Sequence, residues 1–373
     1  MNAIEIVPVM NRRTLREFIM LPGLLHKYHK NWVPPVYRDE WHYFNRKRNP
    51  AYRYCDTVQA LAYDSGNLAG RIMGVVNYRY NQAAKTKTAR FCLFECTHDQ
   101  KIAHKLFRFI EEWALSKGMS GIVGPFGMYY HDPIGYMVEG FAHIPAISTY
   151  YNFEYIDAII RGEGYAVFKD LAVYKIMIPD RIPAIYEKIL VRVKNNHHIK
   201  LADCRSRRDL KPYILPVLSL MNETYADIYG YSQLDKEELE LLAKQYLPLL
   251  NPDLVKIAEY SGEVIGFLIA MLNISKGLIA SKGHLFPFGI FKILKAAGMS
   301  RQLDLLIGAI KPKYQGIGVD VLMGLDMIET GRRKGFEFMD SHLEMETNLK
   351  VRAEMEKVGG QQYKKYRIYE KLF

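Results

Sequence analysis

Cysteine is scarce in this sequence. The 373 residues include four cysteines, and their scattered positions fit neither a disulfide framework nor a zinc site. Cys92 and Cys96 share parity with Phe94 inside an apolar run, which predicts one buried face of a strand. We therefore expect free thiols in a reducing compartment, and no metal site.

A long apolar segment is also lacking. The first residues show no apolar core of a signal peptide, and no stretch reaches the roughly 18 uninterrupted apolar residues that a transmembrane helix needs. We therefore expect a cytoplasmic protein, with association to a membrane surface as an open alternative.

Negative charge is in deficit, since 40 acidic residues face 51 lysines and arginines and the formal net charge is +11. Such an excess favours an anionic partner, which could be a nucleotide-bearing cofactor, an acidic carrier protein, a membrane surface or nucleic acid. The sequence has no nucleic-acid recognition motif and no clustered basic helix, so a nucleic-acid partner is not expected.

The chain does contain an internal repeat. The segment from Ile6 to Ile19 matches that from Leu201 to Ile214 at an offset of 195 positions, and the Ser-Gly hairpins at Gly66 and Gly262 match at 196. Chance similarity between two α/β segments is the alternative. The repeat predicts an α/β (α+β) fold of two tandem domains, each a mixed, mostly antiparallel sheet flanked by helices.

The offset also locates the boundaries. It grows to 217 between Gly118 and Gly335 and returns to 195 between Gly164 and Gly359, so the second copy carries about 22 extra residues before its central helix. We place an N-terminal domain at residues 1–178, a proline-containing linker at 179–197 and a C-terminal domain at 198–373.

A glycine turn joins a strand to a helix in the second copy. The apolar run from Leu303 to Ile310 leads through Gly316 and Gly318 into an amphipathic helix. Backbone N–H groups at such a helix start suit phosphate, and glycine lets phosphate oxygens approach the backbone. Neither the Walker A motif nor the dinucleotide fingerprint fits. A glycine turn without a ligand is the alternative.

The residues of this turn resemble the acyl-CoA signature of the GNAT superfamily, Gln/Arg-x-x-Gly-x-Gly/Ala. They match it at Gln315 and Gly318 and depart from it at Asp320. The resemblance implies a pyrophosphate loop for acetyl-CoA or another acyl-CoA, with an acyl carrier protein as a further possible donor. The implied cofactor-binding residues are Lys313, Gln315, Gly316, Ile317, Gly318, Val319, Asp320 and, from the family's pattern after the fifth strand, Asn348. The first copy has Glu95 and Asp99 in place of the glycines, so we expect it to be degenerate.

GNAT enzymes hold the thioester between their fourth and fifth strands and often use a carboxylate as base. Alternation along the expected fifth strand puts Asp340, His342, Glu344 and Glu346 on one face, unless this is only a solvated face. Glu344 is the first candidate for the base and His342 the second. Methionine stands at position 355, where many members carry the tyrosine that protonates the thiolate. Tyr363 is therefore the candidate acid, and the alternatives are Tyr366, water, or a domain that is not an acetyltransferase of the common type.

Two further features concern the acceptor. Residues 274–302 combine apolar bulk with basic residues, which is typical of a helix on an anionic membrane or a lid over an acyl chain; a helix packed between the domains is the alternative. The aromatic runs 31–41 and 124–141 are predicted to line an acceptor cleft.

Over nearly its full length the chain resembles bacterial tandem-GNAT proteins, some of which look related to acyltransferases acting on long-chain amines. The predicted function is an N-acyltransferase that uses acyl-CoA or an acyl carrier and acts on an amine, including a lipid or long-chain amine. The alternative is a non-catalytic ligand-binding or scaffold protein built from two decayed copies.

Overall fold

The structure is a computed structural model, and it describes residues 4–182, 186, 188, 190, 191, 193, 198–247 and 250–373. The elements of the first half are β1 (Ile4–Pro8), α1 (Arg12–Leu25), α2 (Tyr37–Tyr43), η1 (Pro50–Arg53), β2 (Cys55–Asp64), β3 (Asn67–Asn77), α3 (Tyr78–Ala84), β4 (Thr88–Cys96), α4 (Gln100–Ser116), β5 (Gly121–Gly124), β6 (Tyr136–Glu139), α5 (Ile156–Gly162) and β7 (Ala166–Met177).

The second half repeats this order. Its elements are β8 (Ile199–Leu201), α7 (Arg207–Leu210), η2 (Lys211–Tyr213), α8 (Ile214–Thr224), α9 (Lys236–Tyr246), η4 (Pro252–Leu254), β9 (Val255–Tyr260), β10 (Glu263–Leu272), α10 (Ser275–Ser281), α11 (Gly289–Gly298), β11 (Gln302–Ile310), η5 (Pro312–Tyr314), α12 (Val319–Arg333), β12 (Phe338–Asp340), β13 (Glu344–Met345), α13 (Leu349–Lys357) and β14 (Gln361–Leu372). Between its hairpin and its next strand the first half has one helix, α3, whereas the second half has two, α10 and α11.

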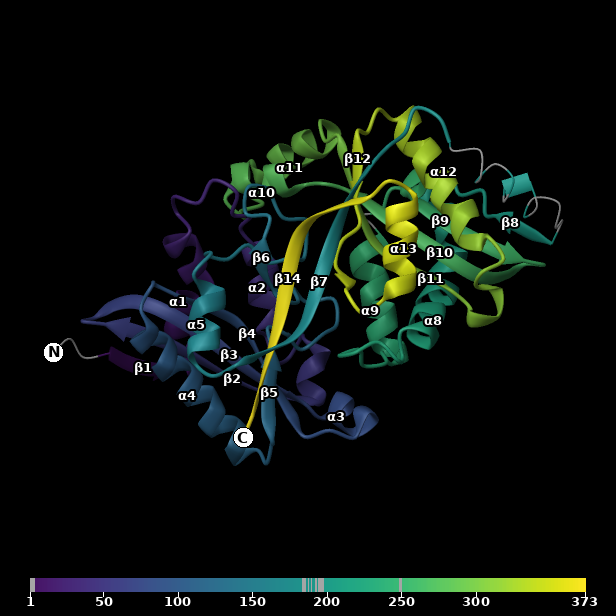
Figure 1. Cartoon of the computed structure of the whole chain (residues 1–373). Helices are drawn as coiled ribbons and strands as arrows, with labels where there is room; N and C mark the ends of the chain where they lie inside the picture. Colours follow the sequence, from purple (N-terminus) through teal and green to yellow (C-terminus); the bar gives the residue numbers. More distant parts are fainter. Residues whose placement is uncertain are drawn as a thin grey trace.

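The described strands form one continuous, mostly antiparallel sheet in the order β1-β2-β3-β4-β5-β14-β7-β12-β11-β10-β9-β8 (Figure 1). Among the pairings within the described residues, β4 with β5 and β11 with β12 are parallel. The mixed, mostly antiparallel α/β architecture predicted from the sequence is confirmed.

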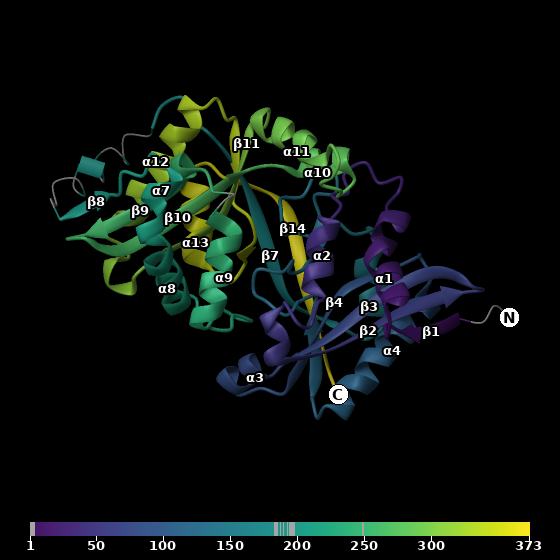
Figure 2. The same cartoon turned by 180° about the vertical axis from the view of Figure 1, so that it is seen from behind.

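The final strands of the two halves lie side by side at the centre of the sheet (Figures 1 and 2). Strand β14 pairs with β5 and β6 of the first half, whereas β7 pairs with β12 and β13 of the second. The two strands also pair with each other along most of their length. Each half therefore receives a strand next to its own fifth strand from the other half.

The domain boundaries 1–178 and 198–373 stay a prediction. Each repeat contributes its last strand to the part of the sheet that the other repeat forms, so the sheet does not divide where the repeats do. Of the predicted linker 179–197, residues 183–185, 187, 189, 192 and 194–197 lie outside the described residues.

Local signals in the sequence explain several elements. Ser65 and Gly66 turn the β2–β3 hairpin with φ of 51° and 79°, and Ser261 and Gly262 turn the β9–β10 hairpin with φ of 50° and 87°. Successive left-handed residues match the twist of the flanking strands. The two Ser-Gly hairpins are thus confirmed.

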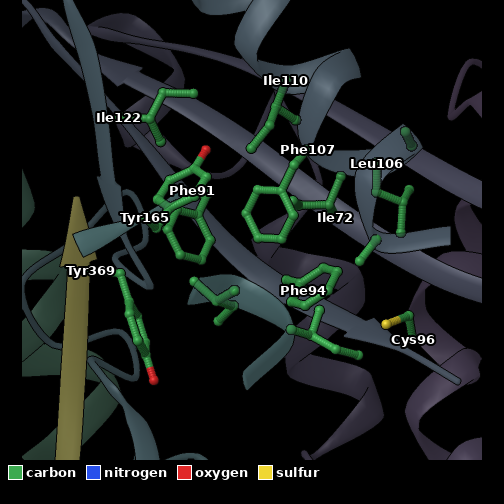
Figure 3. Close-up of a cluster of buried hydrophobic side chains, with 14 of the residues drawn as sticks. Ile72, Phe91, Phe94, Cys96, Leu106, Phe107, Ile110, Ile122, Tyr165 and Tyr369 are labelled. Carbon is green, nitrogen blue, oxygen red and sulfur yellow. The ribbon is translucent and has the colours of Figure 1, made fainter. Parts of the chain in front are cut away.

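Helices cover both faces of the sheet. In the first half, α4 packs on one face through Leu106, Phe107 and Ile110, which join Phe91 and Phe94 in a buried cluster (Figure 3). On the other face, α1 contributes Phe18 and Ile19 to a cluster with Met73 and Cys92. In the second half, α8 and α12 pack against β10 and β11 in separate clusters. No helix in the described part of the chain is both long and apolar enough to cross a membrane.

Candidate active site

The sheet opens beside β11. Strands β11 and β12 pair over three residues, from Gln302 with Phe338 to Asp304 with Asp340. The chain then leaves β11, and β13 pairs with β7 instead. On its other side β11 has a bulge, because Ile269 pairs with Ile307 and Ala270 with Leu305, which leaves Leu306 without a ladder partner. The result is a wedge between two strands with an irregular backbone edge.

A large cavity occupies this wedge and extends to the first half. Its volume is about 1810 Å³, above the usual ~300–1,000 Å³ of small-molecule pockets. The walls come mainly from apolar residues of α8, α9, β10, β11, α12 and α13, and one end is closed by residues 128–132 of the first half. Of the predicted site residues, the lining includes Gln315, Gly316, Ile317, Gly318, Asp320, His342, Glu344 and Asn348.

The glycine turn presents free backbone donors to this cavity. Gly316 has φ of 73°, and Gly318, with φ of 98°, stands at the start of α12 without a capping side chain. No described residue accepts a hydrogen bond from the N–H groups of Gly316, Ile317 or Gly318. A Cβ at Gly316 would meet no atom within 4 Å. The open space and the converging donors fit a pyrophosphate group.

The turn is fixed from both sides. Fully buried Val319 holds the start of α12 in a core cluster, and the Gln315 side chain donates to the Ile310 carbonyl at 3.1 Å. Lys313 is exposed outside the cavity lining, with its Nζ 5.5 Å from the Tyr314 ring. Lys311 forms an ion pair with Glu263. Asp320 lies in the first turn of α12 and faces the cavity.

The surroundings of the Glu344 carboxyl group favour its neutral form. Burial, and to a lesser extent the nearby Glu354 carboxylate, raise its pKa to about 8. The pKa of Glu354 is itself raised, by burial and then by Asp320. A carboxylate with a pKa near the working pH is well suited to accept a proton from an attacking nucleophile.

His342 holds a defined tautomer beside Glu344. Its Nε2 lies 3.0 Å from the carbonyl oxygen of Ile147, which can only accept, so Nε2 carries the hydrogen. Burial lowers the pKa of the ring, so His342 is neutral at pH 7 with an unprotonated Nδ1.

The predicted alternation of four ionisable residues along one strand face is wrong. His342 adopts a left-handed conformation with φ of 60°, and its N–H bonds the Asp340 carboxylate at 2.8 Å. This local bond interrupts the strand between β12 and β13. Asp340 is buried away from the cavity, and Glu346 pairs with Lys365 at 3.1 Å.

Tyr363 is not brought to the cavity. It lies on β14, where its hydroxyl donates to Asp340, and Lys364 Nζ bonds the same carboxylate at 2.6 Å. Asp304, directly across the ladder from Asp340, receives hydrogen bonds from Asn273 and Gln302. Tyr363 thus belongs to the network around Asp340 and does not line the cavity.

Three tyrosines at the cavity wall were missed from the sequence as site residues. Tyr130, Tyr225 and Tyr231 pack edge to face with centroids 5.5–5.9 Å apart. Burial, and then the charge of Glu344, raise the pKa of Tyr130 to about 12. The aromatic run 124–141 was the available signal for Tyr130, and the structure places its residues 128–132 and Ile134 at the cavity. The run 31–41 instead contacts the segment after α10.

The equivalent opening of the first half is filled by its own side chains. The Tyr150 hydroxyl accepts from the N–H of Leu93 at the bulge of β4, at 3.3 Å. Glu95 forms buried bonds with Arg71 and His26, both at 3.1 Å. Asp99 caps α4. Over the described ranges, no group of three or more His, Cys, Asp or Glu residues is arranged to hold a metal ion.

Known proteins resemble this chain over its whole length. It is 26% identical to bacterial ceramide synthase of Caulobacter vibrioides over 99% of this chain and 97% of the relative, and 25% identical to protein YghO of Escherichia coli over 97% and 94%. A solved tandem GNAT protein from the clavulanic acid biosynthesis pathway matches with a TM-score of 0.57 at 12% identity, covering 99% of this chain and 98% of that one. No model of a known protein family matches the sequence. The chain has the tandem GNAT fold, and these likenesses support an acyltransferase.

Proposed function

We propose that this protein is an N-acyltransferase that moves an acyl group from acyl-CoA, or from an acyl carrier, to the amine of a long-chain acceptor. One observation carries the proposal: the glycine turn, the splayed edge of β11 and the Glu344–His342 pair all line a single large cavity. The full-length likeness to a ceramide synthase supports an amine with a long chain as acceptor.

The donor would enter along the splay. The N–H groups of Gly316, Ile317 and Gly318 would bind the pyrophosphate, and Asn348 lines the same cavity. Leu306 has no ladder partner on β10, and its backbone N–H would donate to the thioester oxygen as it becomes anionic. CoA would supply the activated thioester, and the chain would supply its orientation.

Proton transfers would involve groups at the inner wall. The acceptor nitrogen attacks the thioester carbon, and Glu344 removes its proton as the C–N bond forms. The C–S bond then breaks, and the leaving thiolate takes a proton. Tyr130 is the better-placed acid for that step, because it lines the cavity beside Glu344 while Tyr363 is bonded to Asp340 behind it.

The acceptor would approach from the first half. His131 and Asp132 line that end of the cavity, where Tyr43 donates to Asp132 at 2.8 Å. Apolar residues of α8 and α9 line the same cavity and suit an alkyl chain.

Binding and turnover measurements test the proposal together. Native mass spectrometry against acetyl-CoA, palmitoyl-CoA and acyl-carrier protein, followed by product analysis with a sphingoid base, is expected to show donor binding and amide formation. Donor binding without an amide product from any amine would favour a ligand-binding protein. Absence of any donor binding would favour a scaffold.

The pH profile of turnover provides an internal check on the base. Since Glu344 must be ionised to accept a proton, kcat/KM is expected to rise as pH increases through about 8. Glu354→Gln removes the charge that helps to raise the pKa of Glu344, so this limb should move to lower pH. The pKa of the acceptor amine is the same in assays of the unchanged protein and of Glu354→Gln. If the rising limb of the pH profile does not move, the limb reports the amine and not Glu344.

The cavity length can be probed at Gly324 on α12, which lines the cavity and has no atom within 4 Å of a Cβ position. Gly324→Phe is expected to lower kcat/KM with palmitoyl-CoA by about 10- to 100-fold relative to acetyl-CoA. Gly298→Phe, on α11 and equally unobstructed, is the matched control. Equal effects on both donors would show that the acyl chain does not extend past this helix.

A further inference from the structure

The α10–α11 insertion carries a set of exposed large apolar side chains. Phe286, Phe288, Phe291, Leu294 and Met299, here called the α11 patch, are between 62% and 71% exposed. Helix α11 lies at the outer edge of the molecule in both views (Figures 1 and 2). Such clustering marks an interaction surface rather than ordinary exposure of single residues.

The patch faces outward because the opposite side of α11 is used for packing. A Cβ at Gly277 of α10 would lie 2.5 Å from Cα of Ile293 and 3.1 Å from Cβ of Ala296, so the two helices meet closely there. At 3.6 residues per turn, Phe291 and Leu294 lie on the far side. From the sequence, the alternative for this segment was a helix packed between the domains. That alternative is wrong for this face of α11, which is exposed.

The insertion is anchored to the rest of the protein. Ser275 donates to the carbonyl of Pro145 at 2.9 Å, and Tyr37 N–H donates to the carbonyl of Gly283 at 3.2 Å. The Tyr37 and His284 rings lie 5.1 Å apart. Pro145 and Tyr37 belong to the first half, so contacts with that half hold the insertion in place.

The charge around the patch identifies a partner. Residues 275–301 include five basic residues, Lys276, Lys282, Lys292, Lys295 and Arg301, and no acidic residue. Arg301 is paired with Glu337 at 2.8 Å. The four lysines are exposed, and Lys292 Nζ also donates to the carbonyl of Ala280 at 3.1 Å. Lysines beside apolar side chains keep their stems along the hydrocarbon boundary and their charges at lipid headgroups.

We propose that the α11 patch docks the protein on the surface of an anionic phospholipid bilayer, with its aromatic and aliphatic side chains in the interfacial layer and Lys292 and Lys295 at the headgroups. The helix lies in the membrane plane and does not span it. A second copy of the chain fits less well, because two such surfaces would bring their lysines together.

Vesicle binding tests the proposal without any need for acyl transfer, so its outcome is separate from that of the proposed reaction. The full-length protein is expected to co-sediment with vesicles of phosphatidylcholine and phosphatidylglycerol, and far less with phosphatidylcholine alone. Phe288→Ser/Phe291→Ser/Leu294→Ser should weaken binding more than about 10-fold. Lys292→Glu/Lys295→Glu should weaken it by at least a similar factor, since each lysine near an anionic surface contributes about 5-fold.

The matched control is Leu115→Ser/Leu215→Ser/Leu241→Ser, which removes three exposed leucines from α4, α8 and α9. It should bind vesicles as the unchanged protein does, with thermal unfolding confirming that all variants fold. No binding to anionic vesicles, or unchanged binding of the Phe-Phe-Leu variant, would overturn the proposal. So would a dimer in solution that this variant converts to a monomer, because the patch would then be a contact between copies.

Discussion

Glu344→Gln is expected to lower kcat for acyl transfer by about 10²- to 10⁴-fold, the usual contribution of a positioned general base. Glutamine keeps the size and hydrogen-bonding capacity of the side chain and removes its proton affinity. The dissociation constant for the acyl donor should stay within about threefold, because the pyrophosphate loop is on a different element. Steady-state kinetics and donor titration measure the two effects separately.

Glu346→Gln is the control for this result. It changes a carboxylate two residues away that pairs with Lys365 at 3.1 Å and does not line the cavity. Its kcat should remain near that of the unchanged enzyme. Full activity of Glu344→Gln would remove Glu344 from the mechanism, and a comparable loss in both variants would indicate a general structural effect.

Glu344→Gln, although it is expected to lower activity, should increase stability at high pH. The pKa of Glu344 is raised on folding to about 8, so folding favours the neutral carboxyl; this stability is complete below the unfolded pKa and is lost as pH rises through about 8. Because glutamine is never charged, Glu344→Gln should be more stable than the unchanged protein at pH 9, by roughly 2–4 kcal/mol. An inactive but more stable variant cannot owe its inactivity to unfolding.

Gly318→Arg is expected to weaken acyl-CoA binding at least ~100-fold, equivalent to about 2.7 kcal/mol, and to abolish turnover. Gly318 has φ of 98° at the start of α12, a conformation that an L side chain rarely adopts. The new side chain would also fill the space in front of the backbone donors. Isothermal titration with palmitoyl-CoA or acetyl-CoA measures the effect.

Gly335→Arg is the control for the effect of backbone strain alone. Gly335 follows the same helix at its other end, with φ of 76° and no atom within 4 Å of a Cβ position. This variant should carry a similar conformational cost and bind the donor normally. If Gly318→Arg bound the donor as tightly as Gly335→Arg, the assignment of the loop would be wrong.

The sequence predicted those features that short-range chemistry determines. The Ser-Gly hairpins follow from two adjacent left-handed residues, and the strand, glycine turn and helix from Leu303 to Val319 follow from local pattern. The extra helix of the second copy, α11, falls where the offset of the repeat changes. Each of these depends on neighbours within a few residues or on comparison of the chain with itself.

The sequence did not predict the contacts between residues far apart in the chain. Strands β7 and β14 have similar sequences and could each complete either half, so no local pattern distinguishes exchanged from unexchanged strands. The break at His342 depends on a hydrogen bond to Asp340, whose carboxylate is in turn bound by Lys364 from β14. Tyr130 reaches Glu344 only because residues of the first half close the cavity of the second.

The exchanged strands also bear on how the protein is made. Strand β14 begins at Gln361 and occupies the middle of the sheet, so a ribosome must deliver nearly the whole chain before β5 acquires its neighbour. The first half must wait during synthesis with an open strand edge, which is a site for wrong pairing. Neither half can be removed on its own, because its last strand is an interior part of the sheet of the other half.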